Sequence, residues 1–136
     1  MSDLAHTGWR ATIPTVLAVG IGGIVGANLR WQVGEWAADR WATPFPWGTL
    51  VINLTGSFVL GLYLTLVTER FAGRPLTRLF FATGLLGAYT TFSTFAYETV
   101  RLLQDGHLVT AATYVAASLV FGLVASIAGI AVARMR

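Results

Sequence analysis

Four long stretches of this chain contain no charged residue. They cover residues 11–29, 41–68, 79–97 and 108–133. A helix needs about 20 mostly apolar residues to cross the hydrocarbon core of a bilayer, so each stretch is long enough to do so. With 55% hydrophobic and only 11% charged residues, the chain is not an ordinary soluble domain. The pattern predicts an all-α, multi-pass membrane protein with four transmembrane helices.

These spans account for the chain as a single membrane domain, residues 1–136. We expect them at approximately 12–32, 47–68, 77–103 and 108–133. No cleavable signal peptide is expected, because the first apolar stretch leads directly into Gly-Ala-Asn-Leu-Arg rather than to a small-residue cleavage site. Tryptophans flank the first two stretches, where amphipathic rings favour the headgroup level: Trp9, Trp31, Trp36, Trp41 and Trp47.

The arginines give an estimate of topology. If all four stretches span, both termini share one side with six arginines: Arg10, Arg70, Arg74, Arg78, Arg134 and Arg136. The other side has three: Arg30, Arg40 and Arg101. The positive-inside rule then favours cytoplasmic termini, with a bias small enough to allow insertion in both orientations.

The third stretch contains a polar, helix-weakening segment. Residues 84–95 read Gly-Leu-Leu-Gly-Ala-Tyr-Thr-Thr-Phe-Ser-Thr-Phe. Irregular backbone at membrane depth survives only where protein covers it or where it lines a polar cavity, and broken membrane helices of this kind often hold ions. We therefore expect the third transmembrane helix to be broken near its middle.

Such a break is expected to expose the carbonyl oxygens of Gly87 and Thr90. Two sets of these oxygens, one from each subunit of a two-fold symmetric dimer, would suit a hard cation rather than a transition metal. The residues themselves do not select the ion. As an alternative, Thr90 and Thr91 cap the helix that follows the break.

Uncharged polar side chains in the apolar stretches form a second pattern. Asn53 lies deep within the second stretch, where its amide is costly without partners. Tyr114, Ser118, Gly122 and Ser126 recur every four residues along one helix face. Hydrogen-bond donors without fixed charge can replace the water shell of a small anion. The alternative for each hydroxyl is a bond back to the carbonyl at i−4.

Small residues recur at four-residue spacing in the first and fourth stretches, as in Gly22-x-x-x-Gly26 and in Ser118, Gly122 and Ser126. Such spacing lets helix backbones approach closely. Because four short spans offer few partners, we expect a dimer, with packing inside one chain as the alternative for the Gly22 motif.

Three segments together resemble the Fluc/CrcB family of small fluoride channels. They are Gly-Ala-Asn-Leu-Arg-Trp at 26–31, Gly-Thr-Leu-Val-Ile-Asn-Leu-Thr-Gly-Ser-Phe at 48–58 and Gly-Ala-Tyr-Thr-Thr-Phe-Ser-Thr-Phe at 87–95. The resemblance covers nearly the whole chain. It implies a fluoride-selective passive channel of the cell (inner) membrane that exports fluoride from the cytoplasm down its electrochemical gradient. It also implies an antiparallel, dual-topology homodimer with a structural Na+ at the centre of its interface, held by Gly87 and Thr90.

The same resemblance implies the residues of the fluoride pathway: Asn53, Phe92, Ser93, Thr94, Phe95, Tyr114 and Ser118. Phe92 and Phe95 would present the positive edges of their rings to the anion. Without the family, two phenylalanines in a membrane segment would be interpreted as packing residues. The family pattern leads us to expect a hydroxyl side chain at position 122. Gly122 departs from this pattern.

Two charged residues lie near the ends of the apolar stretches. Arg30 is expected to draw anions into a vestibule, with snorkelling to the headgroups as the alternative. Glu98 follows Phe95 on the same helix face and is expected to influence ion exit. Its alternative is a simple solvated carboxylate at the end of a span.

A proton-coupled antiporter of the small multidrug resistance type is the alternative function, since it too is a four-span protein that forms inverted dimers. Such a transporter needs a carboxylate embedded in the membrane, and the charge-free stretches contain none. An enzyme is not expected, because these stretches hold no general base, nucleophile pair or metal cluster. The expected partners are fluoride, a second copy of the chain and the lipid bilayer, with no nucleic acid.

Overall fold

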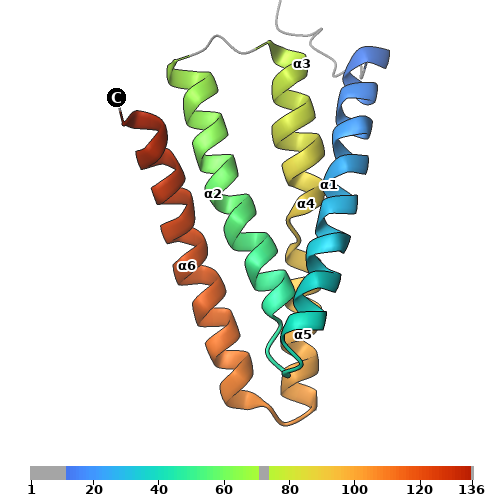
Figure 1. Cartoon of the computed structure of the whole chain (residues 1–136), viewed down its shortest axis with the longest axis vertical. Helices are drawn as coiled ribbons and strands as arrows, with labels where there is room; N and C mark the ends of the chain where they lie inside the picture. Colours follow the sequence, from blue (N-terminus) through green and yellow to red (C-terminus); the bar gives the residue numbers. More distant parts are fainter. Residues whose placement is uncertain (1–11, 71–73, 136) are drawn as a thin grey trace, which may run out of the picture.

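The structure is a computed structural model that describes residues 12–70 and 74–135 (Figure 1). Within these residues it contains helices and no strand: α1 (Ile13–Arg40), α2 (Trp47–Glu69), α3 (Pro75–Arg78), η1 (Leu79–Leu86), α4 (Gly87–Tyr89), α5 (Phe92–Gln104) and α6 (Leu108–Arg134). Four helical stretches are long and apolar enough to cross a membrane, namely α1, α2, the run Pro75–Gln104 and α6. The predicted all-α, four-span architecture is confirmed.

The first helix is longer than the expected first span. α1 continues beyond residue 32 to Arg40, since no proline follows Pro14 in the chain until Pro44. The added turns carry Glu35 and Asp39, so their composition suits the headgroup region rather than the hydrocarbon core. Trp9, expected at the headgroup level, and Arg10 and Arg136, used in the topology estimate, lie outside the described residues.

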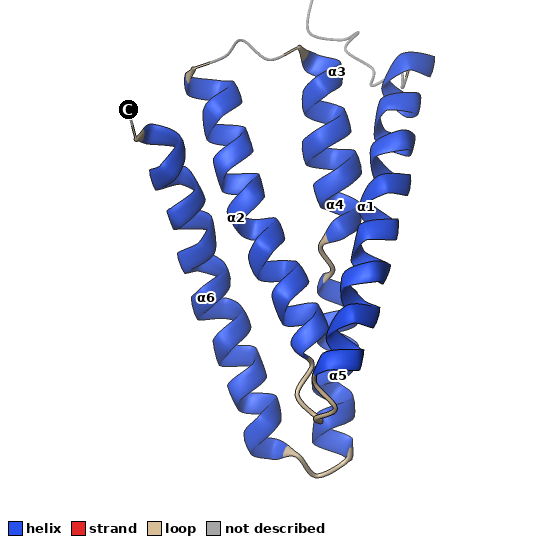
Figure 2. Ribbon diagram, in the orientation of Figure 1, coloured by secondary structure: helices blue, strands red, loops and turns tan. Residues whose placement is uncertain are grey.

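The third membrane-length stretch is not a uniform helix. It begins with α3, continues through the π-helical η1 and α4, and resumes as α5 after two residues of extended backbone (Figure 2). Thr90 has φ −78° and ψ 157°, and Thr91 has φ −150° and ψ 118°. The Thr91 hydroxyl caps α5 by accepting from the Thr94 N–H at 3.2 Å. The Thr90 hydroxyl instead donates to the Leu86 carbonyl at 3.0 Å, so only Thr91 acts as the cap that we considered for both residues.

The helices pack in pairs that are distant in sequence. α1 lies against η1 and α4, and α2 lies along α6 and also contacts η1 and α5 (Figure 1). The connection between α1 and α2 and the connection between α5 and α6 lie at one end of the bundle. At the other end, Arg134 of α6 pairs with Glu69 of α2 at 2.6 Å, and the guanidinium of Arg70 donates to the Met135 carbonyl at 2.8 Å.

Glycines set the close approach of both helix pairs. A Cβ on Gly22 or Gly26 would collide with backbone of η1, and one on Gly129 would collide with the Phe58 carbonyl of α2. Because all of these contacts lie within one chain, the Gly22-x-x-x-Gly26 motif packs α1 on the third membrane-length stretch, as in the alternative that we gave for it.

We expect Gly22→Ala to destabilise the protein by about 1–3 kcal/mol, because the new methyl group meets backbone atoms that cannot move independently. Gly20→Ala is the matched control, since a Cβ there has no atom within 4 Å and alanine favours a helix over glycine. Thermal unfolding of both purified variants in detergent, followed by circular dichroism, measures the difference. Equal stability of the two variants would contradict the packing of α1 on η1.

Candidate ion pathway

The amide of Asn53 on α2 is bonded to the interruption between α4 and α5. Its Oδ1 accepts from the Thr91 N–H at 2.9 Å, and its Nδ2 donates to the Thr91 carbonyl at 3.0 Å. In a continuous α-helix the Thr91 N–H would donate to the carbonyl of Gly87. Asn53 therefore replaces the Gly87 carbonyl as the acceptor for the Thr91 N–H. It gives the N–H and the carbonyl of Thr91 the hydrogen-bond partners that hydrocarbon could not supply.

The carbonyls of Gly87 and Thr90 both lack the donor that a continuous α-helix would supply. The donor for Gly87 is diverted to Asn53, and the Thr94 N–H that would serve Thr90 is bonded to the Thr91 hydroxyl. The described residues contain no group of three or more His, Cys, Asp or Glu side chains that could hold a metal. Coordination of a cation by these two carbonyls stays a prediction.

A cavity of about 260 Å³ adjoins this interruption. It is lined by Asn53, Gly56, Ser57, Leu60, Thr90, Thr91, Phe92, Phe95, Ser118 and Leu119. None of these side chains is charged. Four of the predicted pathway residues meet here: Asn53, Phe92, Phe95 and Ser118.

Several groups in this cavity have no partner, or only some of their possible partners, within the chain. The rings of Phe92 and Phe95 have centroids 5.7 Å apart, and Phe92 is 78% exposed in the single chain. The Ser118 hydroxyl is buried and has no hydrogen-bond partner among the described residues. Asn53 donates one of its two amide hydrogens to Thr91, which leaves the second for a ligand.

The other three predicted pathway residues lie outside that cavity. The Ser93 hydroxyl is 3.3 Å from the Thr91 hydroxyl, and the Thr94 hydroxyl accepts from Thr91 at 3.0 Å. Tyr114 is fully buried, and its ring lies 5.2 Å from that of Phe95. Its hydroxyl donates to Glu98 at 2.7 Å.

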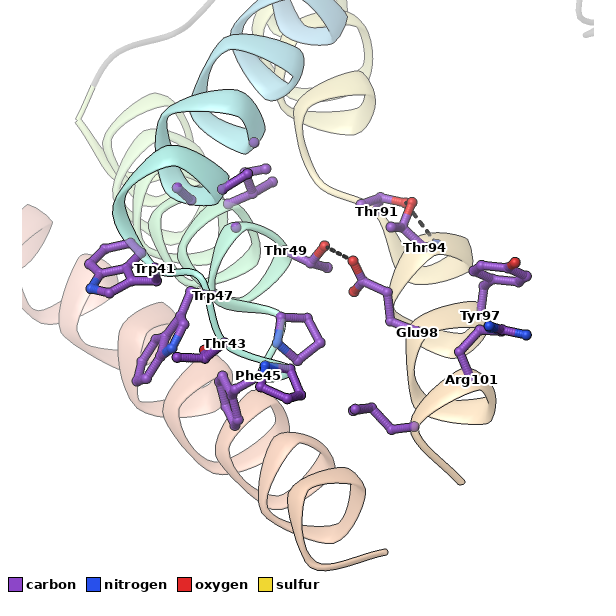
Figure 3. Close-up of a pocket in the computed structure, with 18 of the residues that line it drawn as sticks. Trp41, Thr43, Phe45, Trp47, Thr49, Thr91, Thr94, Tyr97, Glu98 and Arg101 are labelled. Carbon is purple, nitrogen blue, oxygen red and sulfur yellow. Dashed lines mark hydrogen bonds between the residues drawn. The ribbon is translucent and has the colours of Figure 1, made fainter. Parts of the chain in front are cut away.

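Glu98 on α5 is half-buried, and its carboxylate is bonded to side chains of α2 and α6. One carboxylate oxygen accepts from the Tyr114 hydroxyl. The other accepts from the Thr49 hydroxyl at 2.9 Å (Figure 3). The carboxylate thus has two partners within the chain, and its influence on ion exit stays a prediction. Thr49 was missed from the sequence, although it precedes Asn53 by four residues and so shares its helix face.

A larger cavity, of about 810 Å³, lies beside Thr49 and Glu98 at the end of the bundle where α1 meets α2 (Figure 3). Both charged residues that we singled out, Arg30 and Glu98, line it, as do Thr91 and Thr94. The extended residue Thr91 is in the lining of both cavities, whereas Ser93 and Tyr114 of the predicted pathway are in the lining of neither.

Along α6, Gly122 and Ser126 have different surroundings. Gly122 has open space around the position of a Cβ, whereas the Ser126 carbonyl lies 2.5 Å from the position that a Cβ of Gly61 would take. Ser126 is therefore part of the contact between α2 and α6. Beyond Ser118, the polar track that we expected through Gly122 stays a prediction.

Residues 17–130 match the family described as CrcB-like protein, Camphor Resistance (CrcB). The chain belongs to the CrcB family. A relative from Chloroflexus aurantiacus is 46% identical over 119 residues, which cover 88% of this chain and 94% of the relative. One from Acidobacterium capsulatum is 48% identical over 109 residues, or 80% of this chain and 87% of the relative.

A third CrcB relative, from Rhizobium meliloti, is 40% identical over 119 residues, which cover 88% of this chain and 95% of the relative. All three relatives carry the name fluoride-specific ion channel FluC. The resemblance inferred from the three sequence segments is confirmed.

We expect Asn53→Ala to destabilise this CrcB protein, because it leaves the Thr91 N–H and carbonyl without partners, at about 1–3 kcal/mol for each buried group. Asn28→Ala is the matched control, since Asn28 is exposed and donates only to the Ile24 carbonyl of its own helix. Thermal unfolding gives the stability, and hydrogen exchange of the Thr91 amide shows whether the loss is local. An unchanged Thr91 exchange rate in Asn53→Ala would contradict this role of Asn53.

Proposed function

We infer that this chain is a fluoride channel of the membrane and that the cavity beside Thr91 is part of its anion path. The observation that carries this is the composition of the cavity: amide and hydroxyl donors and aromatic rings meet there, with no charged side chain. The relatives named fluoride-specific ion channels support fluoride as the ion. The protein is not an enzyme.

Each group in the path acts on the anion without a chemical step. Fluoride is small and strongly hydrated, so it enters only where donors replace its water. The unpartnered Ser118 hydroxyl and the second Asn53 amide hydrogen supply such donors. The ring edges of Phe92 and Phe95 carry partial positive charge, and their apolar bodies exclude water. Ser93, Thr94 and Tyr114 are proposed as further polar groups of the path.

Transport is passive in this proposal. The groups that line the cavity hold no fixed charge that would trap the anion, and fluoride leaves the cytoplasm down its electrochemical gradient. The multidrug antiporter is not favoured, because the family is one of fluoride channels. Glu98 is a carboxylate within the bundle, but both of its oxygens are bonded to hydroxyls.

The channel is proposed to be an antiparallel, dual-topology homodimer, with the broken third helix of each copy at the centre. Phe92 is largely exposed in the single chain, and so are the polar residues Ser93 and Thr94 beside it, which makes this surface poorly suited to hydrocarbon. A second copy would cover this surface. The carbonyls of Gly87 and Thr90, free of helical donors, would then hold a central structural Na+ from both copies.

Purified protein in liposomes should release fluoride rapidly and chloride slowly, as measured with ion-selective electrodes. Phe92→Ile keeps apolar volume but loses the positive ring edge, so we expect fluoride efflux to fall by about tenfold. Phe81→Ile is the matched control, because the Phe81 ring contacts Tyr63 and Phe80 and lines neither cavity.

Two results would count against these assignments. Absence of fluoride efflux from the unmodified protein would contradict the channel itself. Wild-type efflux from Phe92→Ile would leave the channel standing but remove the proposed contact between this ring and the anion.

A high-resolution map of the purified assembly tests the dimer and the cation together. We expect two antiparallel copies and, between their Gly87–Thr90 segments, one density coordinated by carbonyl oxygens at distances that suit Na+. Parallel copies would refute dual topology. An empty centre in protein that conducts fluoride would refute the sodium site and leave the fluoride path intact.

A further inference from the structure

We propose that Gly56 of α2 is a positioning residue of the anion path, because it seats the methyl group of Thr90 and so fixes the extended backbone beside the cavity. This inference rests on the proposed fluoride channel. Gly56 and Thr90 both line the uncharged cavity of about 260 Å³, together with the proposed path residues Asn53, Phe92 and Ser118. No role was assigned to Gly56 from the sequence.

The contact between Gly56 and Thr90 leaves no room for a side chain at position 56. A Cβ on Gly56 would overlap the Cγ2 methyl of Thr90 and would lie 3.3 Å from Cδ1 of the Tyr89 ring. Gly56 is buried within the regular helix α2, where alanine would favour the helix over glycine. The seat for Thr90 therefore explains the glycine, whereas the conformation of α2 does not.

Thr90 cannot simply turn its methyl group away from an added side chain. Its hydroxyl donates to the Leu86 carbonyl at 3.0 Å, and the hydroxyl and the methyl group are attached to the same carbon. A rotation about χ1 that moved the methyl group would also break this hydrogen bond, and β-branched side chains have restricted χ1 angles. A methyl group added at Gly56 is therefore expected to displace the backbone of Thr90.

Tyr89, the last residue of α4, adds a hydrogen bond beside this seat. Its hydroxyl oxygen lies 2.9 Å from the hydroxyl oxygen of Thr55 on α2. The single hydroxyl hydrogen of Thr55 is directed to the Val51 carbonyl at 2.7 Å, so Tyr89 is the donor and Thr55 the acceptor. The Tyr89 ring thus lies beside Gly56 while its hydroxyl is bonded to the preceding residue of α2.

Contacts from α2 therefore hold each of the three residues 89–91. The contacts of Thr55 and Asn53 are hydrogen bonds, whereas the seat at Gly56 acts by shape alone. Groups that bind a ligand must be held within about 0.5 Å of the productive position. Because Thr90 lies in the cavity lining, its displacement is expected to slow the passage of the anion.

The test separates the number of working channels from the rate of each one. Purified protein is reconstituted in planar bilayers, where single-channel recording gives the fluoride current through one assembly. The fraction of liposomes that release fluoride, at low protein density, gives the number of active assemblies. A residue with a merely structural role changes this fraction and leaves the current of the surviving assemblies unchanged. A positioning residue changes the current itself.

The variants move one methyl group across the contact. Gly56→Ala should lower the single-channel current by about tenfold, since a misplacement of about 1 Å in a positioned site costs up to about a hundredfold. Thr90→Ser keeps the hydroxyl for Leu86 but empties the seat, and should lower the current by about threefold. The double variant Gly56→Ala/Thr90→Ser fills the seat from the other side, so its current should return to within about twofold of the unmodified protein. Gly20→Ala is the matched control, since a Cβ there has no atom within 4 Å.

The proposal is overturned if Gly56→Ala carries the full current, or if the double variant fails to assemble or carries no more current than Gly56→Ala. If Gly56→Ala forms no active assembly, Thr90→Ser decides. Its current must then be lower than that of the double variant, and equal currents overturn the proposal. Failure here differs from failure of the channel itself, which would appear as no fluoride current from the unmodified protein.

Discussion

The pair of hydrogen bonds between the Asn53 amide and the backbone of Thr91 is the contact on which both cavities depend. A helix that stops within a bilayer leaves N–H and carbonyl groups without partners, and hydrocarbon cannot supply them. One side chain on α2 supplies both a donor and an acceptor to the same residue. The extended backbone that results lines the uncharged cavity on one side and the larger cavity on the other.

Close backbone contacts at glycines hold the helices that frame this site. α1 reaches η1 through Gly22 and Gly26, and α2 reaches α6 through Gly61 and Gly129. Without a hydrophobic driving force between helices in lipid, such contacts gain their strength from dispersion at short range. The framework can therefore stay rigid while the residues near the cavities carry hydroxyl and amide groups.

Much of this architecture was predictable because each apolar stretch carries its own signal. Charge-free length identified the four membrane-length helices, and the glycines and threonines of 84–95 marked the segment in which Thr90 and Thr91 are extended. Pairings between distant residues were not predictable. The sequence placed Asn53 at membrane depth, but nothing in it indicated that its partner is the backbone of Thr91, and the contact between Thr49 and Glu98 was missed for the same reason. Small-residue spacing also could not distinguish a dimer contact from the packing of α1 on η1.

The long-range pairing of α2 with α6 has a consequence for the order in which the protein is made. α2 is synthesised early, yet its most extensive contact is with α6, which emerges last of the described helices. Until then the α2 backbone at Phe58 and the carboxylate of Glu69 lack their partners Gly129 and Arg134. The contact between α2 and α6, with the ion pair between Glu69 and Arg134, can therefore form only after α6 has been synthesised.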